Sequence, residues 1–158
     1  MPRKIGLHLR LTDSFTDALE RALALQMPVF QCFLLDQVHR KPMKIDKETC
    51  ALVAAARDKF VHIFIHASYW INLADLSPSG YKVLKRELKA AQQLGADAII
   101  FHPGSAIRRT HKHDGIESVV TVLNEMNREY PNIILVLENT SHGGKTVGSD
   151  FNDFVEIK

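Results

Sequence analysis

The sequence has little cysteine, no long apolar run and no large excess of either charge. Its two cysteines are too few for a disulfide framework, so we expect reduced thiols and a cytoplasmic protein. No apolar run approaches the roughly 20 residues of a membrane span, and no apolar segment follows the basic N-terminus. We therefore expect neither a membrane protein nor a secretory signal. The net charge of +2 predicts no general attraction to nucleic acid, so DNA binding would need a local basic patch.

What is present is an alternation of short apolar runs and longer amphipathic stretches. With 46% hydrophobic and 24% charged residues, the 158-residue chain resembles a single globular domain over 1–158. The apolar runs predict strands buried on both faces at 5–9, 29–35, 61–65, 98–101 and 133–137. Helical patterns cover 14–26, a segment capped by Asp46, 81–94, a segment starting at Asp114 with Glu117 as its capping partner, and a segment after Ser149 or Asp150. This order predicts an α/β fold with a parallel sheet.

Polar residues stand in or at the end of each predicted strand. They are His8, Asp36, His66, His102 and Glu138. Because the carboxyl ends of parallel strands meet at one rim of the sheet, these side chains are expected to converge. A single histidine there is more often structural, but two histidines with a carboxylate suit a divalent metal such as zinc or manganese. His62, inside the third run, is instead expected to face the helices.

Four stretches carry a more specific pattern: IGLH at 5–8, HASYWINL at 66–73, LGA at 94–96 followed by FHPGS at 101–105, and LENT at 137–140 with VGS at 147–149. In this order they resemble the signatures of endonuclease IV, a family of metal-dependent apurinic/apyrimidinic endonucleases. The stretches together span nearly the whole chain.

The resemblance implies a xylose-isomerase-like TIM barrel, here truncated to about five β-α units because a complete barrel has about 250 residues. It implies hydrolysis of the DNA backbone at abasic sites during base excision repair. His66, His102 and Glu138 match zinc ligands of the family, and Glu138 is the residue assigned to catalysis. In the family the remaining ligands come from the other half of the barrel. At most one metal site is then complete, and little or no activity is one expected outcome.

The resemblance also assigns DNA contacts. Tyr69 matches the aromatic residue that the family inserts at the lesion, and Trp70 beside it is a further stacking surface. His8 is expected to line the site. Arg108 and Arg109 begin the one basic cluster, which either follows a phosphate backbone or forms a solvated loop.

Other interpretations remain open. A basic DNA contact of the family aligns near Val38, where His39 or Arg40 is the available replacement. A sugar isomerase or epimerase of the same barrel superfamily would also use strand-end histidines and glutamate, although the motifs favour the endonuclease. The third interpretation is a half-barrel remnant without catalysis, whose open edges are covered by a homo-oligomer or a second chain.

Overall fold

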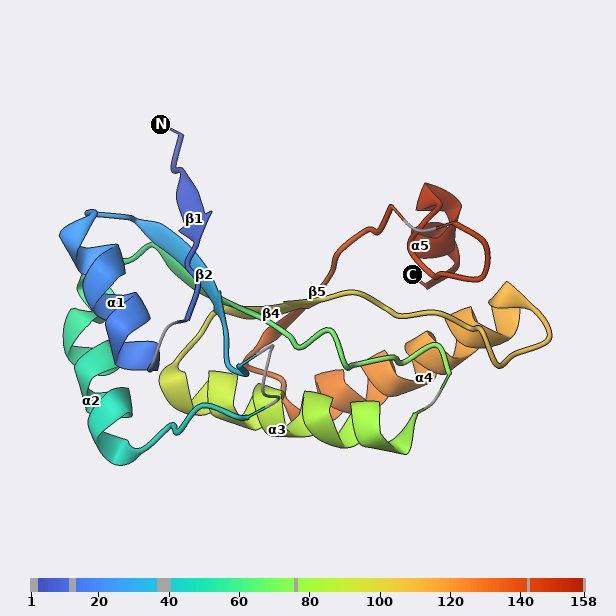
Figure 1. The fold of residues 1–158 in the computed structure, drawn as a ribbon, viewed down its shortest axis with the longest axis horizontal. Helices are drawn as coiled ribbons and strands as arrows, with labels where there is room; N and C mark the ends of the chain where they lie inside the picture. The colour runs from blue at the N-terminus through green and yellow to red at the C-terminus, as the bar shows by residue number, and fades with distance from the viewer. Residues whose placement is uncertain (1–2, 12–13, 37–40, 76, 142, 158) are drawn as a thin grey trace.

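The computed structural model alternates strands and helices along the chain (Figure 1), and it describes residues 3–11, 14–36, 41–75, 77–141 and 143–157. The strands are β1 Gly6–His8, β2 Val29–Phe33, β3 His62–His66, β4 Ala98–Phe101 and β5 Ile134–Leu137. The helices are α1 Phe15–Ala24, α2 Lys47–Ala56 with the short 3-10 helix η1 Arg57–Lys59, α3 Pro78–Leu94, α4 Lys112–Glu129 and α5 Phe151–Ile157. All strand pairs in the described sheet are parallel, in the order β1-β2-β3-β4-β5. The predicted α/β fold with five parallel units is confirmed.

Local signals explain most helix ends. The Ser14 side chain accepts the Asp17 N–H at 3.1 Å and so caps α1. Gly95, in the left-handed conformation with φ of 70°, ends α3 as the sequence predicts. The predicted start of α4 is wrong, however. The Asp114 carboxylate accepts the His111 N–H at 2.9 Å, which makes Asp114 the third helical residue and not the residue before the helix.

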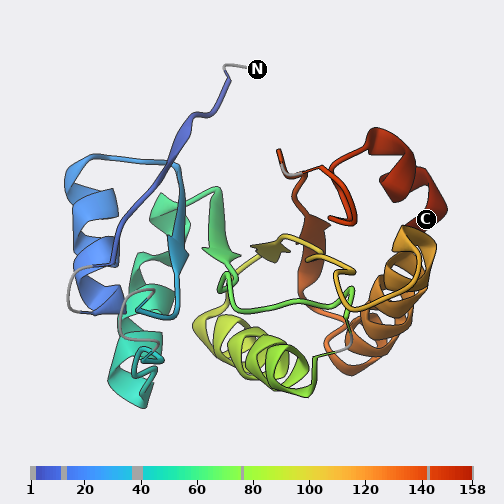
Figure 2. The ribbon, with the colours of Figure 1, turned by 45° about the vertical axis from the view of Figure 1, so that its right-hand side comes forward.

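The two faces of the sheet differ in their cover. The outer face is buried under α1 to α4, which lie in an arc around the strands (Figure 2), and it carries fully buried residues such as Phe30, Ile63 and Ile99. The inner face is open within the described chain: Ile134 is 63% exposed, and Val136 is exposed as well. The expectation of burial on both faces is therefore wrong for the inner face, because no described residue packs over it.

His62 lies on this inner face and not against the helices. Side chains alternate along a strand, so His62 shares a face with Phe64 and His66 while Ile63 and Ile65 point into the core. The His62 and Phe64 rings stack at 5.4 Å with an interplanar angle of 12°. The prediction for His62 failed because an apolar run without polar alternation does not mark its two faces, and Ile63 and Ile65 occupy the side toward the helices. Among the described residues, no helix combines the length and apolar character needed to cross a membrane.

Candidate metal centre

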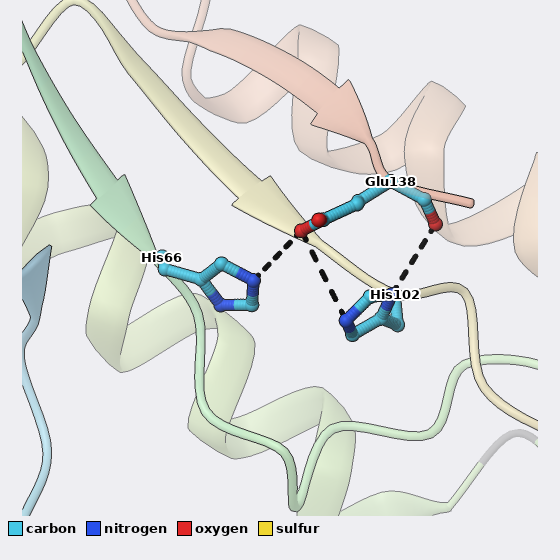
Figure 3. Close-up of side chains that lie close together, drawn as sticks. All are labelled: His66, His102 and Glu138. Carbon is cyan, nitrogen blue, oxygen red and sulfur yellow. Dashed lines mark hydrogen bonds and ion pairs between the residues drawn. The ribbon is translucent and has the colours of Figure 1, made fainter. Parts of the chain in front are cut away.

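Three polar side chains meet at the carboxyl-terminal rim of the sheet (Figure 3). His66 is the last residue of β3, whereas His102 and Glu138 directly follow β4 and β5. Glu138 Oε2 lies 2.9 Å from His66 Nε2 and 3.9 Å from His102 Nε2. One ligand atom from each residue falls within 4.8 Å of the other two. Neighbouring parallel strands thus bring together residues that are up to 72 positions apart in sequence.

The contacts of the two imidazoles suit a divalent ion. His66 Nδ1 lies 2.8 Å from the Ala67 carbonyl oxygen, and His102 Nδ1 lies 3.3 Å from the Glu138 carbonyl oxygen. A carbonyl oxygen only accepts hydrogen bonds, so each Nδ1 that bonds to it carries the proton. Each Nε2 is then the nitrogen that faces the carboxylate. This arrangement, with one ring nitrogen held by the protein and the other directed at the site, is usual for histidine ligands of metals.

The donor spacing also fits. Ligands at about 2 Å from a tetrahedral zinc ion lie roughly 3 Å from one another. The two Nε2-to-Oε2 distances bracket that value. His66 is buried and the Glu138 side chain is partly exposed, which leaves one side of the cluster open to solvent. The donor set of two imidazoles and one carboxylate therefore fits a zinc-type ion with room for a further ligand.

Hydrogen bonds between loops hold this rim together. The Leu73 and Ala74 N–H groups both donate to the Pro103 carbonyl, at 3.1 and 3.2 Å. The Asn72 amide accepts the Ser105 N–H and donates to the Ser105 carbonyl, both at 3.0 Å. The motif that follows β3 is thereby fastened to the motif that follows β4.

Gly104 allows this close approach. Its φ is 101°, and a Cβ atom there would lie 2.2 Å from Asn72 Oδ1. Its carbonyl oxygen accepts the Val147 N–H at 3.0 Å, which ties in the loop after β5. Only glycine adopts this positive φ and also leaves room for Asn72 Oδ1.

Aromatic side chains surround the two histidines. The Tyr69 ring is 62% exposed and stacks on His102, with ring centres 6.1 Å apart and an angle of 12°. Trp70 is exposed next to it. The His8 ring lies 5.8 Å from His66, and its Nδ1 is 2.7 Å from Gln31 Nε2. Burial, reinforced by His66, lowers the pKa of His8. His8 and Tyr69 thus lie beside the candidate ligands, with Trp70 exposed next to Tyr69, and their contacts with DNA stay a prediction.

The predicted basic residues lie farther along the loop between β4 and α4. Arg108 is exposed, and its backbone N–H donates to Asp75. The Arg109 guanidinium donates to the Ser118 hydroxyl at 3.2 Å, and its carbonyl accepts from Lys145. The Arg109 guanidinium thus has a partner outside the His66, His102 and Glu138 cluster, whereas the Arg108 contact involves only its backbone. Val38, His39 and Arg40 lie outside the described residues.

A buried carboxyl group beside the rim was not predicted from the sequence. Glu87 on α3 is only 2% exposed, and its Oε2 accepts the Ser68 N–H at 2.9 Å. Burial raises the pKa of Glu87 to about 7. A signal was available in the sequence: Glu87 stands among Leu84, Leu88 and Ala91, on the face of the helix that is otherwise apolar.

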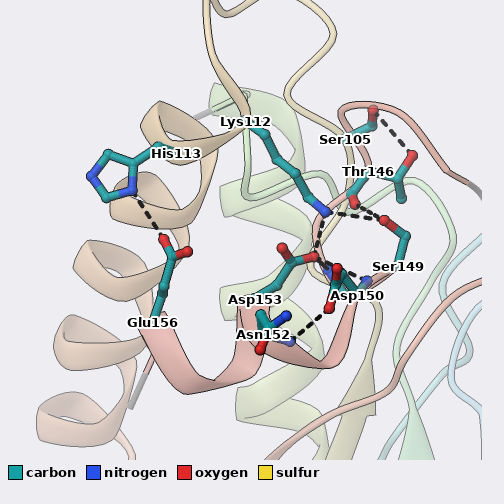
Figure 4. Close-up of polar contacts among 10 residues, drawn as sticks. Ser105, Lys112, His113, Thr146, Ser149, Asp150, Asn152, Asp153 and Glu156 are labelled. Carbon is teal, nitrogen blue, oxygen red and sulfur yellow. Dashed lines mark hydrogen bonds and ion pairs between the residues drawn. The ribbon is translucent and has the colours of Figure 1, made fainter.

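A second buried carboxylate holds the loop after β5 (Figure 4). Asp153 Oδ2 lies 2.6 Å from Lys112 Nζ and accepts the Gly148 N–H at 2.8 Å. Burial opposes ionisation of Asp153, but hydrogen bonds from Lys112, Gly148 and Asp150 outweigh it, so the pKa of Asp153 is lowered. This network fixes α5 and the loop against the start of α4.

A cleft of about 320 Å³ opens beside His102. Its walls come from all three motif loops, and the polar ones include Tyr69, Asn72, Ser105 and Thr146. The cleft therefore offers hydroxyl and amide groups within the same rim as the candidate ligands.

Comparisons with known proteins agree with the fold described above. A family model described as xylose isomerase-like TIM barrel matches residues 13–158. A relative named probable endonuclease 4, from Halorhodospira halophila, is 31% identical over 163 residues, which cover 98% of this chain and 54% of the relative. The crystal structure of endonuclease IV from Thermus thermophilus matches with a TM-score of 0.79 at 28% identity, over 99% of this chain and 58% of that one.

A sugar epimerase shares the fold as well. The structure of an L-ribulose 3-epimerase matches with a TM-score of 0.71 over 98% of this chain and 55% of its own, but at 14% identity it shows the fold alone. The chain spans about half the length of the curated relatives it matches. The resemblance to endonuclease IV is confirmed, and the chain belongs to the family of xylose isomerase-like TIM barrels.

Proposed function

We propose that this chain carries an endonuclease IV-like site for metal-dependent hydrolysis of DNA at abasic sites. The observation that supports it most is the convergence of His66, His102 and Glu138, from three strand ends, to within 4.8 Å of one another. Each histidine presents Nε2 to the carboxylate while Nδ1 faces a backbone carbonyl. The names of the endonuclease 4 and endonuclease IV relatives support the same reaction class.

His66, His102 and Glu138 are the residues that would hold the ion, and zinc is the metal we propose, with manganese as the alternative. A divalent ion supplies Lewis acidity, lowers the pKa of water and offsets negative charge on a phosphate. Glu138 is central among the three residues, because its Oε2 faces both Nε2 atoms. The His66 and His102 side chains would supply the two nitrogen ligands next to it.

The surroundings of the site suit a damaged DNA strand. Tyr69 and Trp70 are exposed aromatic side chains at the rim, where they can stack on a base next to a gap in the duplex. The neighbouring cleft offers Ser105 and Thr146 hydroxyls to sugar and phosphate oxygens. Arg108 and Arg109 are placed on the loop after β4, where they would attract the backbone phosphates.

The test is incision of a duplex with one synthetic abasic site by zinc-loaded protein. His102→Ala is the matched variant, since it removes one proposed ligand of the site. We expect incision on the 5′ side of the lesion by the wild-type chain and a loss of at least about a hundredfold in the variant. An intact duplex without a lesion is the substrate control.

Each outcome selects one interpretation. Incision that His102→Ala leaves unchanged would overturn the metal assignment. Interconversion of ketose sugars instead of incision would favour the isomerase or epimerase, whose fold this chain shares. Zinc binding without either activity would favour a half-barrel without catalysis, for which size-exclusion chromatography would then report whether a second copy covers the exposed Ile134 face.

A further inference from the structure

Glu87 has no role in the site described above, yet its position is costly for a carboxyl group. The side chain lies on the core face of α3 and is 2% exposed. Among the described residues, its Oε1 atom is buried without a hydrogen-bond partner. Burying a carboxyl group with one oxygen unpaired lowers stability. A hydrophobic side chain would pack here without that cost, so the contact made by the other oxygen is the feature to explain.

That contact leads to the candidate metal ligand His66 through a single peptide group. Glu87 Oε2 accepts the Ser68 N–H at 2.9 Å. The carbonyl oxygen of the same peptide group, which belongs to Ala67, lies 2.8 Å from His66 Nδ1. The N–H and the carbonyl of one peptide point in opposite directions, so a bond at the N–H end fixes where the carbonyl end points. The order of contacts is therefore Glu87, the Ala67–Ser68 peptide, and His66.

Ala67 and Ser68 are buried, and Ser68 accepts the Ile71 N–H at its carbonyl and the Trp70 N–H at its hydroxyl, but these contacts do not involve the Ala67–Ser68 peptide group itself. The Ala67 N–H, which belongs to the preceding peptide, donates to the Ile100 carbonyl at 2.7 Å and continues the β3–β4 ladder. Beyond Ser68 the chain leaves the sheet, and Tyr69 and Trp70 turn out to solvent. The Glu87 contact is thus the first anchor after the ladder ends. Losing it would remove the hydrogen bond that fixes the N–H end of this peptide group, and with it the direct restraint on where the Ala67 carbonyl points.

We infer that Glu87 is a positioning residue: it orients the Ala67–Ser68 peptide so that His66 keeps its proton on Nδ1 and presents Nε2 to Glu138 and a metal ion. This inference rests on the proposed function for its metal, but the tautomer of His66 is a property of the chain by itself. The charge of Glu87 is not required, since both the ionised and the neutral carboxyl group accept a hydrogen bond through Oε2. Hydrogen bonds behind a metal-bound histidine commonly change metal affinity by about 10 to 100-fold.

Two substitutions separate the acceptor from the packing. Glu87→Gln keeps an oxygen that accepts the Ser68 N–H, whereas Glu87→Met fills similar space without an acceptor. We expect the zinc dissociation constant, measured by competition with a chelating dye, to stay within about threefold for Glu87→Gln and to rise at least about tenfold for Glu87→Met. Urea unfolding of the same proteins shows whether a change in the zinc dissociation constant is accompanied by a loss of stability.

Leu88→Ala is the matched control for stability. It truncates a fully buried neighbour on the same helix and should lower the urea midpoint of unfolding without changing zinc affinity. If Leu88→Ala weakens zinc binding as much as Glu87→Met, the effect is general destabilisation and the inference fails. If Glu87→Met binds zinc as tightly as the wild type, it fails as well.

A readout without metal keeps the inference testable if the wild-type chain binds no zinc. Long-range ¹H–¹⁵N NMR spectra report which imidazole nitrogen of His66 is protonated. We expect a protonated Nδ1 in the wild type and in Glu87→Gln, and a mixture of tautomers in Glu87→Met. Absence of zinc binding would count against the proposed function alone, whereas an unprotonated Nδ1 in the wild type would overturn the role of Glu87.

Discussion

The loops after β3 and β5 are each anchored by one buried carboxyl group, but the two groups have opposite surroundings. Glu87 accepts the Ser68 N–H and leaves its other oxygen unpaired, with its pKa raised to about 7 by burial. Asp153 accepts the Gly148 N–H and also faces the Lys112 ammonium, with its pKa lowered despite burial. The same type of anchor thus gives opposite dependence on pH, because Asp153 pairs directly with the Lys112 ammonium, whereas burial dominates at Glu87.

The largest effect is expected from removing the paired carboxylate. Asp153→Ala leaves the Lys112 ammonium mostly buried without a counter-charge, and we expect the free energy of unfolding to fall by about 4 kcal/mol. Urea unfolding near neutral pH measures it. In the double variant with Lys112→Met the unpaired charge is gone, so the part of the loss due to that charge should be recovered, whereas the lost acceptor for the Gly148 N–H remains. Equal losses in the single and double variants would show that the ion pair is not the cause.

The second-largest effect is the dependence of the unfolding free energy on pH that Glu87 causes. Its folded pKa, about 7, lies above the ordinary 4.5, so the folded state holds the proton more tightly than the unfolded state. Its contribution to stability is complete below about pH 4.5 and is lost as the pH rises through about 7, a change of about 3 kcal/mol. Urea unfolding at several pH values should show this decline in the wild type.

Glu87→Gln removes this titration and is the control for it. The difference in unfolding free energy between wild type and variant should shift in favour of the variant as the pH rises from about 5 to about 8. Asp153 contributes the opposite slope, since its lowered pKa makes its stabilisation disappear as the pH falls. A difference between wild type and Glu87→Gln that is constant with pH would contradict the comparison.

The smallest effect is expected where the loops are joined without any charge. Asn72→Ala removes two hydrogen bonds to Ser105 and should cost about 2 kcal/mol, with no dependence on pH. Asn72→Asp keeps the acceptor for the Ser105 N–H but turns a second acceptor oxygen toward the Ser105 carbonyl. Above the ordinary pKa range of aspartate these two oxygens repel, so the loss should be at least as large as in Asn72→Ala. A clearly smaller loss in Asn72→Asp would mean that the bond from the Ser105 N–H dominates this contact.

The candidate ligands could be predicted because their placement follows from a regular pattern of strands that the sequence shows. Apolar runs become buried strands, parallel strands end at one rim, and His66, His102 and Glu138 stand at or just after three such ends. The two anchors were not predicted: Asp153 looks like an ordinary surface residue of a helix, and the position of Glu87 on an apolar helix face does not show which loop it holds. Their burial depends on which loop packs against each helix, and that is a property of the assembled fold.

The wrong predictions, for His62, the start of α4 and the inner face of the sheet, likewise depend on features that the sequence pattern leaves open. His62 was assigned to the wrong face because the apolar run at 61–65 lacks the polar alternation that would mark its two faces, and Ile63 and Ile65 occupy the side toward the helices. The start of α4 was misplaced because Asp114 suits both the position before a helix and its third residue. The exposed inner face at Ile134 was missed because strands rich in Ile, Val and Leu have no polar side that marks exposure.

The binding of one divalent ion by His66, His102 and Glu138 together is the central claim. Crystals grown with zinc and measured at the zinc absorption edge test it directly through anomalous difference density. We predict one strong peak at about 2 Å from His66 Nε2, His102 Nε2 and a Glu138 carboxylate oxygen. A peak bound through either Nδ1 atom, or no peak between these three side chains at saturating zinc, would contradict it.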